Sequence, residues 1–258
     1  MASAQKPRLR LRKATPTDVP DIVRVHAEAF GPGIMDHIMY PGGFTEDARA
    51  KFGATFFPAP DPSKPSSGET IIVVVERAPE DGVDDAPGEI VAFGKWIIYR
   101  GPRPEEEWNV AAREMTQEML GEGADLVAYK AFIADHHYMR KKAMKGDPAL
   151  YLNILACTPK HGRLGAGSTI LRWGSELADK EGLVAWLEAS PQGFPLYSKF
   201  GFKAVDVQDL EITERFGAIH DGVEDWGTNS AVDLAGPLPK GVFRTVMMRR
   251  EPQAVPSS

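Results

Sequence analysis

Residues 151–202 constrain the fold of this chain more than any other stretch. Residues 150–156 form a run of bulky apolar side chains, which predicts a strand buried in a sheet, and Pro159 ends it. After a glycine-rich turn, apolar residues recur at helical spacing from Ile170 to Ala178, and Gly182 is suited to end that helix. Residues 183–187 are again continuously apolar. This order predicts a parallel strand–helix–strand unit, followed by a short helix that carries Tyr197.

The turn that opens the predicted helix indicates an anion-binding site. The first turn of a helix has backbone N–H groups without partners and a partial positive charge, and glycines let a ligand approach the backbone. A P-loop is excluded because Gly167 is followed directly by Ser168 and Thr169, without the required lysine. A dinucleotide-binding loop needs three spaced glycines, and only Gly165 and Gly167 have that spacing, although Glu188 could imitate its acidic residue.

This stretch resembles the core of the Gcn5-related N-acetyltransferase (GNAT) superfamily, whose coenzyme A loop has the pattern Gln/Arg-x-x-Gly-x-Gly/Ala. The three patterned positions hold Gly162, Gly165 and Gly167, so the first departs from the family, and Arg163 beside it could compensate. The segments Glu-Ala-Ser-Pro from residue 188, Leu-Tyr-Ser-Lys from residue 196 and Phe-Gly-Phe from residue 200 resemble the closing part of the family core. The sequence of this stretch is most similar to a fungal branch of the family, and the segments on either side of it match the family only in outline.

The resemblance implies an α/β fold in which a mixed β-sheet, splayed at its centre, is flanked by helices. A chain of 258 residues with 43% hydrophobic residues is long enough for one large domain, so we expect a single domain over 1–258. We expect a helical insertion at 102–147, before the core strand, and a disordered tail at 251–258.

The remaining elements follow from local patterns. Strands are expected at 8–12, 70–75, 90–99, 204–212 and 242–248, with the second and third forming a hairpin. Helices are expected from Thr15 to Phe30 and at 34–40. In the insertion, one helix should contain Trp108, Met115 and Met119, and another should run from Leu126 to Met139. Two loops are expected at 58–68 and 79–88.

Acetyl-CoA is the cofactor that the resemblance implies. By position, the backbone of Leu155, Ala156 and Cys157 should bind the pantetheine arm and polarise the thioester. The other expected cofactor contacts are Gly162, Arg163, Leu164, Gly165, Ala166, Gly167, Ser168, Ser190 and Tyr197.

Two residues are the candidate catalytic groups. In the family a tyrosine of the closing helix protonates the departing thiolate, and Tyr197 holds that position; packing alone is the other interpretation. Glu188, at the end of the second strand, is the candidate base, acting through a water, or else only a polar residue at a strand end. An acetyl-enzyme on Cys157 with His161 is disfavoured, because a lone cysteine in a buried strand is usually inert.

The expected reaction transfers an acetyl group to a primary amine of a small molecule, by direct attack in a ternary complex. Tyr151 and Asn153 stand where some family members place Glu or His, and with Asp36, His37 and Tyr40 they are the candidate substrate contacts. Acetylation of a peptide or protein amine and an inactive acyl-CoA-binding sensor remain as alternatives.

Composition limits the partners. A net charge of −6 disfavours nonspecific nucleic-acid binding, and a single cysteine excludes an internal disulfide. No apolar run could span a membrane and no secretory signal is present, so we expect a cytoplasmic monomer or homodimer. No metal is expected, because His136 and His137 point in different directions on a helix, and the basic run at 140–142 is expected to be a solvated face.

Overall fold

A computed structural model describes residues 8–59, 68–78 and 88–254. The expected loops at 58–68 and 79–88 lie largely outside these residues, and so do residues 255–258 of the expected tail; residues 251–254 are described. None of the helices within the described ranges is long and apolar enough to cross a membrane.

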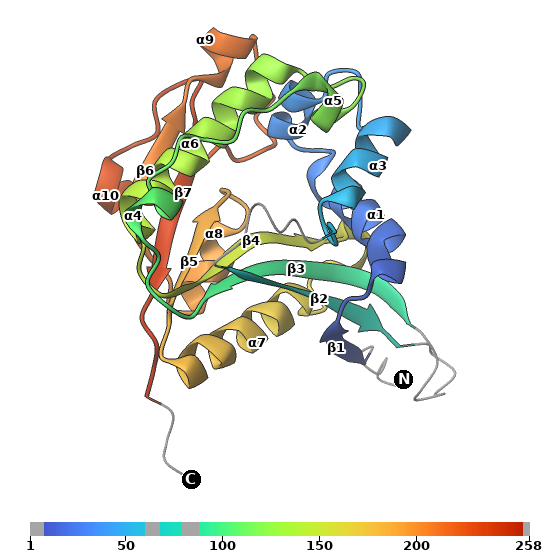
Figure 1. The fold of residues 1–258 in the computed structure, drawn as a ribbon. Coiled ribbons are helices and arrows are strands. Elements are labelled where there is room, and N and C mark those ends of the chain that lie inside the picture. The colour runs from blue at the N-terminus through green and yellow to red at the C-terminus, as the bar shows by residue number, and fades with distance from the viewer. Residues whose placement is uncertain (1–7, 60–67, 79–87, 255–258) are drawn as a thin grey trace, which may run out of the picture.

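The seven strands of the described residues form one sheet in the order β1-β2-β3-β4-β5-β7-β6 (Figure 1). They are β1 (Leu9–Lys13), β2 (Glu69–Arg77), β3 (Glu89–Tyr99), β4 (Ala149–Cys157), β5 (Val184–Ala189), β6 (Lys203–Leu210) and β7 (Phe243–Arg250). The β4–β5 pair is parallel, and the other pairs are antiparallel. The mixed sheet, the β2–β3 hairpin and the parallel unit around the core helix were all expected.

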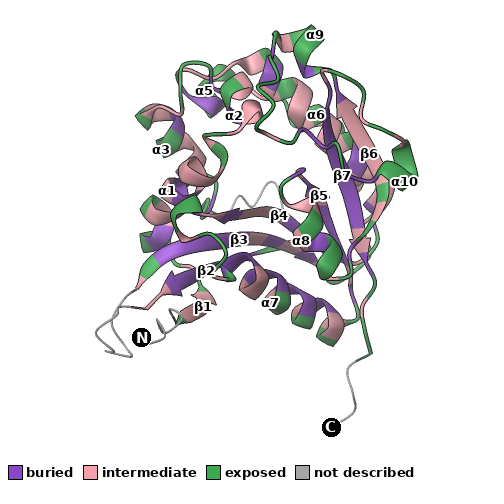
Figure 2. Ribbon diagram, turned by 180° about the vertical axis from the view of Figure 1, so that it is seen from behind, coloured by how far each residue is buried: buried purple, intermediate pink, exposed green. Residues whose placement is uncertain are grey.

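Helices cover both faces of the sheet (Figures 1 and 2). One face is covered by α7 (Ala166–Glu181), and we call it the α7 face. The opposite face is covered by α1 (Val19–Phe30) and by α6 (Leu126–Met144), and we call it the α1 face. The other helices are η1 (Pro16–Asp18), α2 (Ile34–Met39), α3 (Glu46–Ala54), α4 (Glu105–Trp108), α5 (Gln117–Leu120), η2 (Pro159–His161), α8 (Phe194–Lys199), α9 (Ile212–Phe216) and α10 (Val232–Ala235).

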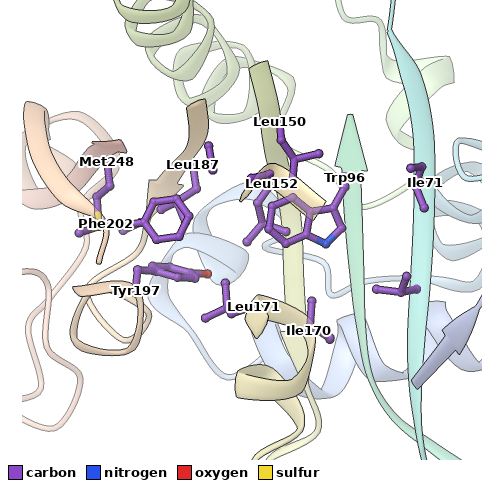
Figure 3. Close-up of a cluster of buried hydrophobic side chains, with 14 of the residues drawn as sticks. Ile71, Trp96, Leu150, Leu152, Ile170, Leu171, Leu187, Tyr197, Phe202 and Met248 are labelled. Carbon is purple, nitrogen blue, oxygen red and sulfur yellow. The ribbon is translucent and has the colours of Figure 1, made fainter. Parts of the chain in front are cut away.

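The largest cluster of buried side chains lies between α7 and the sheet (Figure 3). Ile170 and Leu171 of α7 contribute to it together with Trp96 of β3 and Leu187 of β5. The helix can come this close to β3 because residue 174 is glycine: a Cβ on Gly174 would lie 2.2 Å from the Trp96 ring.

Two of the expected elements have wrong bounds. The helix expected to contain Trp108, Met115 and Met119 ends at Trp108, and Met115 lies outside any helix before α5 begins. The backbone leaves the helical conformation at Asn109, with φ −90° and ψ 42°. Trp108 packs closely on Gly146, at the point where the chain returns from α6. Ile212 was expected to end a strand, but it begins α9 and is fully buried.

Helix α3 was not expected from the sequence. Thr45 caps it by accepting a hydrogen bond from the backbone N–H of Ala48 at 3.2 Å. Its buried residues are Ala48 and Gly53, which carry almost no side chain, so the helix has no apolar stripe for a periodicity argument to find.

The sheet forks between β4 and β5. Their parallel pairing covers Ala149–Leu152 against Val184–Leu187, and the strands then separate. Beside the fork, the β3–β4 register shifts, so that Trp96 is opposite Leu152 while Lys95 is opposite Ile154. The extra residue, Asn153, is therefore a β-bulge, and a bulge leaves backbone groups of its strand unpaired. The splayed centre that the resemblance implied is present.

Candidate active site

Three of the candidate residues meet at the fork, on the α1 face. Glu188 is the first residue of β5 beyond the parallel pairing, and its side chain is only 4% exposed. The Tyr151 hydroxyl donates a hydrogen bond of 2.6 Å to Glu188 Oε2. The Asn153 amide nitrogen lies 3.4 Å from the same hydroxyl. The structure thus connects Glu188, Tyr151 and Asn153 in one chain of contacts.

Arg140 of α6 completes this group. Its Nε lies 3.0 Å from Glu188 Oε1, and its guanidinium carbon is 5.3 Å from the centre of the Tyr151 ring. Burial raises the pKa of the Glu188 carboxyl above its ordinary value, while Arg140 and Tyr151 act in the opposite direction. Burial also raises the pKa of Tyr151, so its phenol stays protonated and donates to the carboxylate. Glu188 Oε1 is buried and accepts no hydrogen bond of good geometry within the described structure, so the ion pair with Arg140 is its contact there.

Tyr197 lies on the opposite side of the fork, in the α7-face cluster. Its ring packs on Gly193, where a Cβ would approach to 2.6 Å, and beside Phe202 at 6.3 Å between ring centres. Figure 3 shows the Tyr197 hydroxyl directed toward the side of Leu171. Burial raises the pKa of this phenol, with a further contribution from the Cys157 thiol. A buried, protonated phenol meets the requirement for a proton donor, and its packing is consistent with the plain structural interpretation as well.

The loop before α7 has the backbone shape of an anion site. Gly165 precedes the helix with a backbone φ of 95°, in the left-handed region, and the backbone φ of Arg163 is 64°. No side chain caps α7 and no acidic residue lies in its first turn. The N–H groups at this end of a 16-residue helix can therefore bind an anion.

The end of β4 lies directly against this helix terminus. A Cβ on Gly167 would lie 3.3 Å from Cys157 Sγ and 3.6 Å from a Leu155 methyl group. Leu155, Cys157, Ala166 and Gly167 are thus neighbours, whereas Ala156 is buried on the α1 face. These contacts bring the two parts of the expected cofactor site, strand end and loop, to one place.

The remaining loop residues have separate positions. Gly162 and Arg163 are exposed, and Leu164 and Ser168 are partly buried. Ser190 follows β5, and its hydroxyl oxygen accepts a hydrogen bond of 3.3 Å from the Gly193 N–H, so it shapes the turn into α8.

Cys157 is poorly suited to act as a nucleophile. Burial raises the pKa of its thiol to about 11, so it is protonated at neutral pH. The His161 ring nitrogen lies 3.0 Å from Glu89 Oε2, and no hydrogen bond joins His161 to Cys157 among the described residues.

The other substrate candidates gather at a second place, between α2 and α6. Asp36 and Tyr40 are buried, and the Tyr40 ring lies 6.1 Å from that of Tyr129 on α6, while His37 is exposed. Burial raises the pKa of Asp36. Within the part of the chain that the structure describes, no hydrogen bond or ion pair connects these residues to Glu188.

The interpretation of the basic run at 140–142 as a solvated face is wrong for Arg140. Lys142 does pair with Asp206 at the surface, but Arg140 turns inward to Glu188. The spacing of Phe132, His136 and Arg140 at four-residue intervals was the signal that could have found it.

His136 stacks on Phe132 at 4.0 Å, and burial lowers its pKa to about 3, so it is neutral. Over residues 8–59, 68–78 and 88–254, no three side chains are grouped to hold a metal ion.

Comparison with known proteins places this geometry in a class. No family model matches the chain. Among solved structures, the mosquito arylalkylamine N-acetyltransferase like 5b superposes with a TM-score of 0.53 at 14% identity, covering 95% of this chain and 100% of that one. The histone acetyltransferase HPA2 and related acetyltransferase from Corynebacterium glutamicum gives a TM-score of 0.48 at 20% identity, with coverages of 98% and 100%. The PaiA N-acetyltransferase from Thermoplasma acidophilum, in complex with coenzyme A, gives 0.41 at 12% identity, with coverages of 95% and 99%.

The chain has the fold of the GNAT acetyltransferases, as the sequence predicted.

Proposed function

We propose that this protein is an N-acetyltransferase that transfers the acetyl group of acetyl-CoA to a primary amine of a small molecule. The observation that carries the proposal is the fork between β4 and β5. One side of it holds the buried Glu188–Tyr151 pair, and the other holds Tyr197 and the uncapped end of α7. The fold supports one domain built around this fork, with residues 102–147 inserted before β4.

The residues around the fork fit acetyl-CoA. The uncapped first turn of α7 and the loop before it would hold the pyrophosphate, and the backbone of Leu155, Ala156 and Cys157 would bind the pantetheine arm. When bound there, acetyl-CoA supplies a thioester carbonyl for the amine to attack.

Two proton transfers remain for the protein. A free alkylammonium has a pKa near that of lysine, about 10.4, so it must lose a proton before it can attack. Glu188 accepts that proton, directly or through a water, while Tyr151 and Arg140 hold its carboxylate in place. As the C–N bond forms and the C–S bond breaks, the attacking nitrogen releases its second proton to solvent. Tyr197 donates its proton to the departing thiolate sulfur and regains one from solvent. Attack proceeds in one ternary complex, because Cys157 is protonated and forms no hydrogen bond with His161 among the described residues.

Helix α6 supports a small acceptor over a peptide. Its Arg140, Met139 and Met144 pack over Tyr151 and Trp186, so the β5 side of the fork is covered on the α1 face. A peptide substrate would need an open groove at this place.

Thiol release from acetyl-CoA across a panel of amines, amino acids and basic peptides tests the proposal. We expect amine-dependent release by the wild-type protein. Tyr197→Phe should lower kcat by about 10²-fold or more, because the thiolate loses its proton donor. The change in melting temperature caused by acetyl-CoA should be retained. Tyr138→Phe, on the exposed side of α6, is the matched control.

Other outcomes have clear meanings. Binding of acetyl-CoA without release from any amine would support the inactive sensor instead. Release with peptides alone would support a protein acetyltransferase. Absence of any acetyl-CoA binding would contradict the acetyltransferase and the sensor alike.

A further inference from the structure

Lys95 lies on the same sheet face as the catalytic pair. Along β3, Phe93 and Ile97 flank it on the α1 face, and its backbone is opposite Ile154, next to the Asn153 bulge. This lysine belongs to no sequence motif, and it stands alone among the apolar residues of its strand.

Among the described residues, no carboxylate forms a hydrogen bond or ion pair with Lys95. Its Nζ donates a hydrogen bond of 3.2 Å to the Thr55 carbonyl at the end of α3, and lies 5.1 Å from the centre of the Phe56 ring. Burial lowers the pKa of Lys95, and no carboxylate opposes that effect. An ammonium has three donors, so the Thr55 carbonyl satisfies only one of them.

Three buried or half-buried arginines of the described structure have carboxylate partners. Arg140 pairs with Glu188, Arg244 with Asp209 and Arg250 with Asp179. Partial burial of a charge without an opposite charge is unfavourable, so an anion of a ligand would be favoured beside the half-buried Lys95.

The usual spacing of strands allows one ligand to reach from the fork to Lys95. Neighbouring strands are about 4.8 Å apart, so β3 and β5 lie about 10 Å apart where the sheet is intact, and more where it forks. A molecule with its amine at Glu188 can therefore place a second group several bonds away at Lys95.

We propose that Lys95 binds a carboxylate of the acceptor, so that the preferred substrate is an amine that carries a carboxylate several bonds from its nitrogen. This inference rests on the proposed acetyltransferase function and names its substrate class. Lys95 selects the acceptor, Glu188 deprotonates it, and the Phe56 ring and the Thr55 carbonyl hold the ammonium of Lys95 in place.

Matched acceptors test the inference. We would compare 4-aminobutyrate with butylamine and 6-aminohexanoate with hexylamine, since each pair differs only in the carboxylate. A hydrogen bond between charged groups is worth about 1.5–3 kcal/mol, so the better amino acid should exceed its alkylamine by about 10- to 100-fold in kcat/KM. The chain length that gives the larger ratio reports the separation of Lys95 from the reacting amine.

Variants then assign the preference to Lys95. Lys95→Met should remove this ratio, and Lys95→Arg should keep part of it because the positive charge remains. Lys142→Met, at an exposed lysine of α6, is the control and should keep the wild-type ratio. The change in melting temperature caused by 6-aminohexanoate in the presence of coenzyme A gives a second readout that needs no turnover.

The outcomes separate the inference from the proposed function. Equal kcat/KM values within each pair, or a ratio unchanged in both Lys95 variants, would overturn the inference and leave the acetyltransferase intact. If no amine is acetylated, the proposed function fails, and the melting experiment then tests the carboxylate site by itself. Stabilisation of the wild type but not of Lys95→Met by 6-aminohexanoate would support that site. Equal stabilisation of both proteins would overturn the inference.

Discussion

Glu188 and Arg140 come from distant parts of the chain and form one buried ion pair. Burial disfavours the charged carboxylate, whereas the guanidinium of Arg140 favours it. Tyr151 binds the second carboxylate oxygen and thereby orients the group. Chain topology predicted Glu188 as the candidate base, but the partner that tunes it could not be recognised within a basic run.

Replacement of Arg140 should change the pH dependence of the reaction. Without the guanidinium, the pKa of Glu188 rises further, so a higher pH is needed to keep the base deprotonated. We expect Arg140→Met to move the acidic limb of the kcat/KM profile upward by about one unit, and Arg140→Lys to move it less.

Lys142→Met is the control for loss of a positive charge from α6. The Arg140→Met protein must be folded and must still bind acetyl-CoA. If the acidic limb of its kcat/KM profile does not move, Arg140 does not act on Glu188.

At the scale of elements, α7 connects the cofactor loop to the core. Its first turn contacts the end of β4 through Gly167, and its middle contacts β3 through Gly174. Helical periodicity and the two flanking strands predicted this unit. The close contact with Trp96 was not predictable, because residue 96 lies on a strand far away in the sequence.

Gly174→Ala should destabilise the protein. In an ordinary helix this change is favourable by up to about 1 kcal/mol. Here the new Cβ would lie 2.2 Å from the Trp96 ring, and overpacking of this kind costs about 1–3 kcal/mol. Urea unfolding measures the difference, with Glu176→Ala on the exposed side of α7 as the control. A gain in the free energy of unfolding would show that the packing at Trp96 is loose.

At the scale of the whole molecule, a set of ion pairs joins the first strand to the rest of the sheet. Arg12 of β1 contacts both Asp18 oxygens, at 2.7 and 2.8 Å, and its Nε lies 2.7 Å from Glu76 of β2. The hydrogen bond from Arg12, with others from Thr15, lowers the pKa of Asp18 from 3.8 to about 2. Asp18 is 7% exposed but the Arg12 side chain is 35% exposed, so solvent screens this pair in part.

Acid should therefore weaken the fold through Asp18. A carboxyl group whose pKa is lower in the folded state stabilises the protein above its unfolded pKa, and this contribution is lost as the pH falls from about 4 to about 2. Asp18→Asn should lower the free energy of unfolding by about 2 kcal/mol at pH 7, with a smaller difference at pH 2. Urea unfolding at several pH values measures it, and Asp233→Asn, at an exposed position, is the control. A difference that does not change with pH would contradict this account.

Local patterns in the chain were enough to predict the parallel unit, the glycine loop before α7 and the helix that carries Tyr197. Each depends on periodicity or on a backbone conformation such as the positive φ of Gly165, which the nearby residues themselves require. The contact of Arg140 with Glu188, the isolation of Lys95 and the extent of α4 depend instead on which distant segments meet. Such contacts depend on packing across the sheet. A one-residue bulge at Asn153 changes which side chains of β4 share a face, and no local sequence pattern predicts this change.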